Sequence, residues 1–386
     1  MLSPNPFAPA TAGQPVTTGT AQTTVEHAAA LSAVLNWYRS KNRKQVFRLF
    51  GAAGTGKSTL AKAIAAQIDG KVLFGAFSGK AASVLRAKGC GGADTIHRLI
   101  YGSPHKDSKD QLTFVLNEAS PLRTADLVIV DEVSMVDAKL GQDLERFDKP
   151  ILVLGDPHQL PPVKGKGYFI RGTADVELTT VLRQRENNPI VKLAKEVRSG
   201  KQTLDFRAEG TSAVIRGVDI DPETVLRADQ VLVGLNETRH RFNARIRELL
   251  GRPFGVPTQG DKLVCLKNNP SKALFNGDIC FVSDVLDVGD AFVKMIIKLE
   301  RAADRSLEVR VRREFFVEDG AGLPEDVKRR EKNHFTFGNV LTVHKAQGSE
   351  WSSVVLFDES EVFSDDRSKW LYTGITRASD RIVVVR

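Results

Sequence analysis

The sequence predicts an α/β protein built from two lobes, each organised around a parallel sheet. Short β-rich runs alternate with helical stretches, and this alternation is typical of βα units whose strands lie parallel. A length of 386 residues is enough for about two or three domains with hydrophobic cores of their own. The expected strands form two series, 46–50, 72–77, 127–130 and 151–154 in the first lobe and 231–235, 340–343, 354–357 and 382–385 in the second.

Two stretches interrupt this alternation. Residues 102–119 contain a run of alternating polarity at 112–116 among polar residues, which predicts a small β-hairpin inserted in the first lobe. Residues 257–336 contain Gly-Asp and Asn-Gly turns between short alternating runs, so we expect an all-β insertion in the second lobe. These runs cover 262–266, 279–285 and 292–299, and a helical pattern at 238–250 precedes them.

Composition excludes several classes of protein. Hydrophobic residues make up 41% of the chain and charged residues 26%, as in a soluble globular protein. The longest apolar runs have only the length of a strand, whereas a membrane-spanning helix needs about 20 apolar residues, so no membrane segment is expected. Residues 1–24 carry no charge and lack the basic start and apolar core of a signal peptide, which predicts a disordered tail.

The cysteines and the net charge give weaker indications. Cys90, Cys265 and Cys280 stand far apart without a CxxC pair, which predicts neither a disulfide framework nor a zinc site. We therefore expect free thiols in a reducing cytoplasm. A net charge of +8 is compatible with a nucleic-acid partner but does not establish one.

A glycine-rich segment predicts a phosphate-binding loop. Residues 51–58 read GAAGTGKS, which fits GxxxxGK[ST] and lies between an apolar strand and a helix that starts near Lys57. The glycines let backbone N–H groups point at phosphate oxygens, Lys57 can reach the β- and γ-phosphates, and Ser58 can bind Mg²⁺. A chance glycine-rich turn is the alternative, which the flanking elements disfavour. The residues expected to contact the nucleotide are Gly51, Gly54, Thr55, Gly56, Lys57, Ser58 and Thr59.

Two acidic residues follow the apolar run at 127–130. Asp131 is expected to hold Mg²⁺ together with Ser58, and Glu132 to orient or deprotonate the attacking water. Acids at a strand end are usually just solvated, but the upstream phosphate loop favours the catalytic interpretation. Since no NKxD-like guanine reader is found, ATP is the favoured nucleotide, and ATP with Mg²⁺ is the expected cofactor pair.

An ordered series of motifs makes the chain resemble the superfamily 1B helicases of the RecD-like and phage Dda type. The resemblance covers residues 24–386, and its motifs occur in the family's order. They are GKAA at 79–82, TIH at 95–97, DEVSMVD at 131–137, GDPHQLPP at 155–162, LRQ at 182–184, LTVHKAQGSEW at 341–351 and YTGITRA at 372–378.

The resemblance implies a domain organisation. Two RecA-like P-loop lobes are expected, with a pin-like β-hairpin insertion in the first and an SH3-like all-β insertion in the second. The implied boundaries are 25–101 with 120–180 for the first lobe, 102–119 for the pin, 181–256 with 337–386 for the second lobe, and 257–336 for the SH3-like insertion.

The resemblance also implies roles in ATP turnover. Gln159 corresponds to the γ-phosphate sensor, Arg183 and Arg377 to arginine fingers, and Gly348 with Glu350 to the segment beside the ribose. A surface ion pair is the alternative for either arginine, and Arg185 makes it a stronger competitor at Arg183. The family's adenine-reading glutamine is replaced by His27 or Glu26, so relaxed nucleotide use is a hypothesis that GTP and CTP turnover would check.

A path for single-stranded DNA across both lobes is implied as well. Small hydroxyl groups and backbone amides suit phosphate contacts that do not read bases. The alternatives are buried core histidines, a solvated basic helix face, and a Phe114 that packs on its own lobe instead of wedging a base pair. The implied residues are Ser78, Lys80, Thr95, His97 and Phe114 in the first lobe and Asn236, Thr238, Arg239, Thr342, His344 and Lys345 in the second.

The function implied by the resemblance is ATP-dependent unwinding of DNA. The motor would step 5′ to 3′ on single strands and at single-strand/duplex junctions, coupling hydrolysis to lobe closure in replication, recombination or repair. Its polarity comes from the family and not from any residue, and a monomer without membrane contact is expected. An RNA-directed motor and a nucleotide-gated clamp without turnover are the alternatives, and the intact catalytic residues disfavour the clamp.

Overall fold

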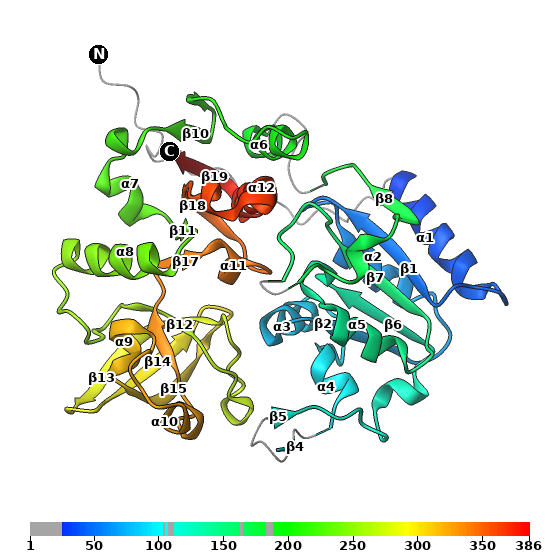
Figure 1. Ribbon diagram of the computed structural model, residues 1–386, viewed down its shortest axis with the longest axis horizontal. Helices are drawn as coiled ribbons and strands as arrows, with labels where there is room; N and C mark the ends of the chain where they lie inside the picture. Colours follow the sequence, from blue (N-terminus) through cyan, green and yellow to red (C-terminus); the bar gives the residue numbers. More distant parts are fainter. Residues whose placement is uncertain (1–24, 103–104, 107–111, 163–164, 183–187) are drawn as a thin grey trace. The chain divides into compact units, whose positions relative to one another are not determined.

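The computed structural model describes residues 25–102, 105–106, 112–162, 165–182 and 188–386 (Figure 1). The predicted tail at 1–24 lies outside these residues. The chain divides into two compact units, Met1–Arg198 and Ser199–Arg386. This boundary falls later than the expected one after residue 180, because helix α6 (Pro189–Arg198) groups with the first unit, where Arg198 lies 3.5 Å from Glu177.

The first unit contains a six-stranded parallel sheet in the order β3-β2-β6-β7-β1-β8. The central strands β6 and β7 are buried along their whole length, which explains why they are continuous apolar runs in the sequence. The parallel α/β arrangement is therefore confirmed. The strands are β1 Val46–Gly51, β2 Val72–Ala76, β3 Asp94–Thr95, β6 Leu127–Asp131, β7 Ile151–Gly155 and β8 Val176–Leu178.

Helices cover both faces of this sheet, and each face has its own hydrophobic core. Val34 of α1 and Leu60 of α2 are buried in one core, and Ile96 of α4 and Leu140 of α5 are buried in the other. The helices are α1 Val25–Arg39, α2 Lys57–Ala65, α3 Gly79–Ala87, α4 Ile96–Ile100 and α5 Ala138–Glu145, with 3₁₀ turns η1 Pro121–Thr124, η2 Val133–Met135 and η3 Phe169–Arg171.

The predicted hairpin region contains a short strand pair. β4 (His105–Lys106) and β5 (Leu112–Thr113) pair antiparallel. The expected alternating run at 112–116 forms only this two-residue strand, and Leu116 makes an isolated antiparallel bridge with Tyr101, directly after α4.

The second unit contains a six-stranded sheet in the order β17-β11-β18-β19-β10-β9, parallel except for the edge strand β9. β11 and β17 are neighbours, so their carboxyl ends bring the helices α8 and α11 to one edge of the sheet. The strands are β9 Arg207–Glu209, β10 Ser212–Ile215, β11 Gln230–Val233, β17 Val340–Thr342, β18 Trp351–Phe357 and β19 Ala378–Val385, and the helices are α7 Pro222–Arg227, α8 Asn236–Leu249, α11 Val343–Ala346 and α12 Arg367–Ile375, with η4 Gly217–Asp219 and η6 Ser360–Asp366.

A five-stranded antiparallel sheet, in the order β15-β14-β13-β12-β16, is inserted in the second unit (Figure 1). The expectation that 257–336 is all β is wrong, because two short helices, α9 (Glu314–Glu318) and α10 (Glu325–Arg330), lie within it. α9 buries Phe315 and Phe316 in the core of this sheet, which needs a cover on its apolar face. The strands are β12 Lys262–Cys265, β13 Ile279–Val288, β14 Phe292–Leu299, β15 Ala302–Arg312 and β16 Phe335–Phe337, with η5 Pro270–Lys272.

Two of the compositional expectations can be compared with the structure. None of the helices within the described residues is both long and apolar enough to cross a membrane. Cys90, Cys265 and Cys280 are buried free thiols. Burial raises the pKa of the Cys265 thiol to about 12, so this thiol stays protonated and unreactive at neutral pH.

Candidate nucleotide and nucleic-acid sites

The loop between β1 and α2 has the backbone shape of a phosphate-binding loop. Gly54 and Gly56 have φ of 80° and 79°, a left-handed conformation that favours glycine. A Cβ on Gly51 would lie 2.8 Å from Thr55 Oγ1 and 2.9 Å from the Leu178 carbonyl oxygen. Gly56 caps α2 without a side-chain hydrogen bond, so the N–H groups of the first helical turn are available to an anion.

Lys57 and Ser58 begin α2 with their polar atoms directed to the loop and to β6. The Lys57 ammonium donates hydrogen bonds to the carbonyl oxygens of Gly51 (2.7 Å) and Ala52 (2.9 Å). Ser58 Oγ donates to Asp131 Oδ2 at 2.7 Å. A hydroxyl and a carboxylate are hard oxygen ligands of the kind that Mg²⁺ prefers, so this pair fits a magnesium site that phosphate oxygens and water would complete. Within the described residues no cluster of three or more His, Cys, Asp or Glu side chains could hold a metal by itself.

Glu132, the candidate general base, has an unusual backbone conformation. Its φ is 56°, in the left-handed region that non-glycine residues rarely adopt. The Glu132 N–H donates to Asp131 Oδ1 at 2.8 Å, so the carboxylate that faces Ser58 also holds this turn. A backbone of this kind costs about 1–3 kcal/mol and is found chiefly where function requires it.

Gln159 lies in the turn after β7, where the sequence predicted a γ-phosphate sensor. Gln159 is 5% exposed, and its backbone N–H donates to the Asp156 carbonyl oxygen at 3.1 Å. Among the described residues its buried Oε1 has no hydrogen-bond partner. A buried amide oxygen without a hydrogen-bond donor costs free energy. Gln159 follows β7, which pairs with β6, so a bound nucleotide and its attacking water could supply the missing donor.

His27 supports the loop from α1, a helix that the sequence analysis did not predict. The imidazole is 6% exposed, and its Nε2 lies 2.8 Å from the Thr55 carbonyl oxygen. Because a carbonyl oxygen only accepts, Nε2 carries the proton and donates. A Cβ on Gly56 would lie 2.8 Å from the imidazole Cε1, which gives a second reason for glycine there. His27 therefore contacts the backbone of the loop, a role that no sequence motif indicated.

The neighbouring Glu26 anchors the start of α1 to the segment after β8. Its carboxylate accepts hydrogen bonds from the N–H groups of Thr179 (2.7 Å) and Thr180 (3.0 Å). Burial opposes ionisation of this carboxyl, but the hydrogen bonds from Thr179 and Thr180 outweigh it, so the pKa of Glu26 is lowered. Glu26 and His27 thus fix α1 to the strand end and to the phosphate loop.

In the second unit, Arg377 and the segment 348–350 lie together. The Arg377 side chain is 5% exposed, and it donates from Nε to the Thr373 carbonyl oxygen and from Nη1 to the Ser349 carbonyl oxygen, both at 3.0 Å. Gly348 has a φ of 72°, so the chain turns sharply just before Ser349. This brings Arg377, Gly348 and Glu350 to one end of β18 and β19, and their roles at a nucleotide stay predictions, while Arg183 lies outside the described residues.

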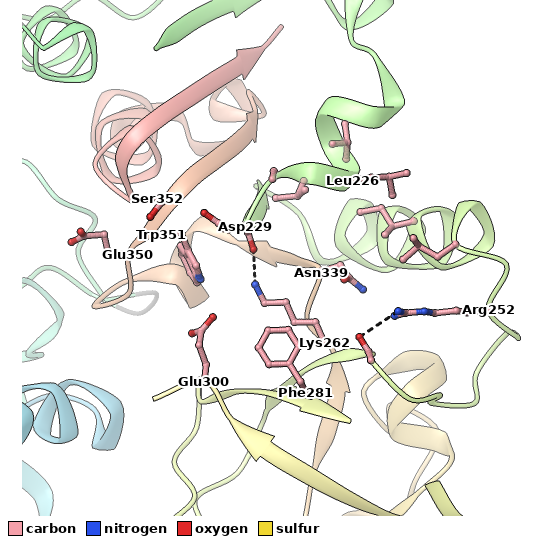
Figure 2. Close-up of a pocket in the computed structure, with 16 residues that line it drawn as sticks. Leu226, Asp229, Arg252, Lys262, Phe281, Glu300, Asn339, Glu350, Trp351 and Ser352 are labelled. Atoms are coloured by element: carbon pink, nitrogen blue, oxygen red, sulfur yellow. Dashed lines mark hydrogen bonds between the residues drawn. The ribbon is translucent and has the colours of Figure 1, made fainter. Parts of the chain in front are cut away.

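A pocket of about 490 Å³ lies beside this segment, at the junction of the parallel sheet and the five-stranded sheet (Figure 2). Glu350 and Trp351 line it from the first sheet, and Phe281 and Glu300 from the second. Lys262 Nζ crosses the junction and donates to the Asp229 carbonyl oxygen (2.6 Å) and to Gln230 Oε1 (2.8 Å). No sequence motif indicated this pocket, because its walls come from seven separate segments of the chain.

Hydroxyl groups follow the ends of two neighbouring strands in the first unit. Ser78 Oγ accepts the N–H of Ala81 at 3.1 Å and caps α3, and Thr95 Oγ1 accepts the N–H of Arg98 at 3.3 Å and caps α4. Each hydroxyl keeps its own hydrogen for a phosphate oxygen, and Lys80 lies in the first turn of α3. The three predicted contacts therefore lie at the carboxyl edge of the sheet.

His97 and Phe114 belong to an aromatic cluster with Tyr101. The ring centroids are 5.8 Å apart for His97 and Phe114 and 5.3 Å apart for Tyr101 and Phe114. Burial lowers the pKa of His97, against an opposing effect of Asp137. Phe114 stays 43% exposed but packs against its own lobe, as the alternative interpretation expected. Its role as a wedge stays a prediction.

Three of the predicted contacts in the second unit, Thr342, His344 and Thr238, have partners within that unit. Thr342 Oγ1 accepts the N–H of Lys345 at 3.3 Å and caps α11, in the same way as the two caps of the first unit. His344 packs against Phe363 with ring centroids 5.4 Å apart, and burial lowers its pKa. Thr238 Oγ1 donates to Glu359 at 2.5 Å.

Asn236 and Arg239 share the first turn of α8. Asn236 Oδ1 accepts a hydrogen bond from Arg239 Nε at 3.1 Å, and the Arg239 side chain is only 2% exposed. Arg239 is ion-paired with Asp319, so it is not the solvated basic residue that the helix pattern suggested.

Comparisons with known protein families match most of the two parallel-sheet regions. An AAA domain model matches residues 28–219, and a UvrD-like helicase C-terminal domain model matches residues 337–385. The ATP-dependent RecD2 DNA helicase of Deinococcus radiodurans is 30% identical over 367 residues, covering 86% of this chain and 46% of that protein. The ATP-dependent DNA helicase dda of Enterobacteria phage T4 is 30% identical over 185 residues, covering 44% of this chain and 42% of that protein. The chain thus spans less than half the length of these two relatives.

Solved structures share the fold at low sequence identity. The Pif1 helicase from Bacteroides, in complex with ADP-AlF3 and ssDNA, has a TM-score of 0.56 and 17% identity, covering 92% of this chain and 91% of that one. The Pif1 helicase from Candida albicans has a TM-score of 0.55 and 17% identity, covering 94% of both chains. These structures support the α/β architecture with its parallel sheets.

Proposed function

The chain belongs to the superfamily 1B helicases of the RecD-like and phage Dda-like type, and from this we propose that it is an ATP-dependent DNA helicase. It would translocate 5′ to 3′ on single-stranded DNA and unwind duplex by coupling hydrolysis to closure of two RecA-like lobes. The observation that carries this proposal is the hydrogen bond from Ser58 to Asp131, which joins the phosphate loop to the acidic strand end.

The residues around the loop have complementary tasks in ATP hydrolysis. The N–H groups at the start of α2 bind phosphate oxygens. When the nucleotide binds, the Lys57 ammonium leaves the carbonyl oxygens of Gly51 and Ala52 and donates to phosphate oxygens instead. Mg²⁺, when bound, neutralises phosphate charge, and Ser58 and Asp131 are the residues that would hold it. Glu132 orients the attacking water and accepts its proton, and Gln159 offers a buried amide oxygen to that water.

The second lobe would complete the site. Arg377 would supply positive charge to the γ-phosphate, Gly348 and Glu350 would lie beside the ribose, and Arg183 would be a second finger. Such a finger is worth about 10³–10⁵ in rate in well-studied phosphoryl-transfer systems. The short pair β4–β5 would be a strand-separating pin, and the five-stranded sheet with α9 would be an SH3-like insertion. We further propose a cytoplasmic monomer that acts at single-strand/duplex junctions.

The single strand would follow the carboxyl edges of the two parallel sheets. Ser78 and Thr95 cap helices there in the first unit, and Thr342 does so in the second. Capped helix starts offer hydroxyl and N–H donors to phosphates without reading bases, so binding should tolerate any sequence and weaken with salt.

Nucleic-acid-stimulated ATP hydrolysis tests this proposal. We expect oligo-dT to stimulate turnover by the wild-type chain and by Lys62→Ala, an exposed lysine on the same helix, but not by Lys57→Ala. Stimulation by uridine-rich RNA and not by DNA would indicate an RNA-directed motor. An ATP hydrolysis rate that neither nucleic acid changes would contradict the proposal.

A further inference from the structure

Two basic residues lie at the edge of the second sheet where β11 and β17 end. The first turn of α8 contributes Arg239, and α11 contributes Lys345. Because these strands are parallel neighbours, their carboxyl ends place both residues on the edge where open α/β sheets bind ligands. Both side chains are cationic, so together they would attract an anion.

An acid from another part of the unit pairs with Arg239. The Arg239 guanidinium directs Nη1 to Asp319 Oδ1 at 3.5 Å and Nη2 to Asp319 Oδ2, the two-point contact that arginine makes with carboxylates and phosphates alike. His240 Nε2 lies 3.6 Å from Asp319 Oδ2. Arg239 is itself oriented by Asn236, whose Oδ1 accepts from Arg239 Nε at 3.1 Å.

The electrostatic coupling extends to Lys345. Burial lowers the pKa of Lys345, Asp319 raises it and Arg239 lowers it further, so the three charges share one environment. The Asp319 side chain is 29% exposed while that of Arg239 is 2% exposed. The carboxylate therefore occupies the open side of a site whose arginine is otherwise enclosed.

Asp319 belongs to the inserted domain and not to the parallel sheet. It follows α9 directly, with a φ of 54° that asparagine and aspartate tolerate better than most residues. α9 packs Phe315 and Phe316 into the five-stranded sheet, so Asp319 caps a helix that is anchored in that domain. The neighbouring Glu318 is exposed and carries the same charge as Asp319. Among the ion pairs of the described residues, it is Asp319 and not Glu318 that pairs with Arg239.

We propose that Asp319 is a resident substitute for a backbone phosphate, and that a nucleic-acid strand must displace it from Arg239 to bind fully. This inference rests on the proposed function. Strand binding then exchanges one ion pair for another, and the same exchange frees α9 from the lobe. The inserted domain thus competes with the single strand for Arg239, which links its position to strand occupancy.

Binding of fluorescein-labelled oligo-dT, measured by anisotropy, tests the inference. Asp319→Asn removes the charge and keeps a residue that accepts the positive φ, while Glu318→Gln removes the same charge one position away. We expect Asp319→Asn to bind about tenfold more tightly than wild type, the effect of one charge-assisted contact. Glu318→Gln, which acts only through screened charge, should change binding by less than about twofold.

A second variant separates competition from a general charge effect. In an Arg239→Gln background the gain from Asp319→Asn should vanish, because the phosphate then has no guanidinium to reach. The added contact should also steepen the dependence of log Kd on log salt by about 0.7. Equal oligo-dT affinities of Asp319→Asn and Glu318→Gln, or weaker binding by Asp319→Asn than by wild type, would overturn the inference. The proposed function would still stand in that case, because the wild-type chain binds oligo-dT. Absence of binding by every protein would overturn both.

Discussion

Ser58 and Asp131 are 73 residues apart in the chain, yet their side chains are joined by a 2.7 Å hydrogen bond from Ser58 Oγ to Asp131 Oδ2. The contact exists because β1 and β6 lie in one parallel sheet and both end at the same edge. Asp131 also accepts the N–H of Glu132, so one carboxylate aligns a magnesium ligand with the candidate base. The expected consequences concern turnover, nucleotide affinity and stability.

Lys57→Ala should abolish ATP turnover and keep most single-strand binding. The ammonium contacts only loop carbonyl oxygens in the structure, at 2.7 and 2.9 Å, and is placed for the nucleotide and not for a nucleic-acid strand. Steady-state hydrolysis and oligo-dT anisotropy on the same preparation measure both quantities. Hydrolysis at the wild-type rate would show that the nucleotide site is elsewhere.

Arg377→Ala should lower kcat by about 10²-fold or more and change KM for ATP little, as removal of an arginine finger does. The substitution also removes buried hydrogen bonds to Thr373 and Ser349, so a lower midpoint of thermal unfolding is expected as well. Lys369→Ala on α12 is the control, because the ion pair of this lysine with Asp366 lies within the same helix end. A rise in KM with an unchanged kcat would contradict the finger role.

His27→Ala should raise KM for ATP and for GTP by a similar factor. The imidazole donates to the Thr55 carbonyl oxygen of the phosphate loop, so its loss loosens a part of the site that every nucleoside triphosphate shares. Turnover measured over a range of each nucleotide gives the two ratios. A loss confined to ATP would instead make His27 the reader of the base.

Glu26→Gln should reduce stability at neutral pH and have no effect in strong acid. The folded-state pKa of Glu26 is lower than its ordinary value of 4.5, so its stabilising contribution is complete above that value and is lost as the pH falls through the folded-state pKa. The loss is at most about 1 kcal/mol, since the carboxylate is partly exposed. Thermal unfolding between pH 2 and 7 measures it, roughly the range in which carboxyl groups titrate. The exposed Asp69→Asn is the control, and a deficit that persists in strong acid would contradict the pKa argument.

Local pattern predicted the parallel sheets well, and for a clear reason. β6 and β7 are buried along their whole length, so the residues before their carboxyl ends are apolar, and the phosphate loop needs glycines that a sequence displays directly. The same logic located Lys57, Ser58 and Asp131.

Features that depend on distant contacts could not be predicted in this way. α9 is buried because Phe315 and Phe316 complete the core of a sheet that four consecutive strands and the later strand β16 build together. His27 contacts the phosphate loop through a helix with no motif, and Arg239 looks like a solvated residue until Asp319 is placed beside it. In each case the partner, and not the residue itself, determines the role.

Strand displacement tests the central claim most directly. Matched duplexes with either a 5′ or a 3′ single-stranded tail would be incubated with the chain, ATP and Mg²⁺, with Lys57→Ala as the blank. The account predicts displacement from the 5′ tail alone, dependent on Lys57. Displacement that survives Lys57→Ala, or none from either tail despite DNA-stimulated hydrolysis, would contradict it, and preference for the 3′ tail would overturn the proposed polarity.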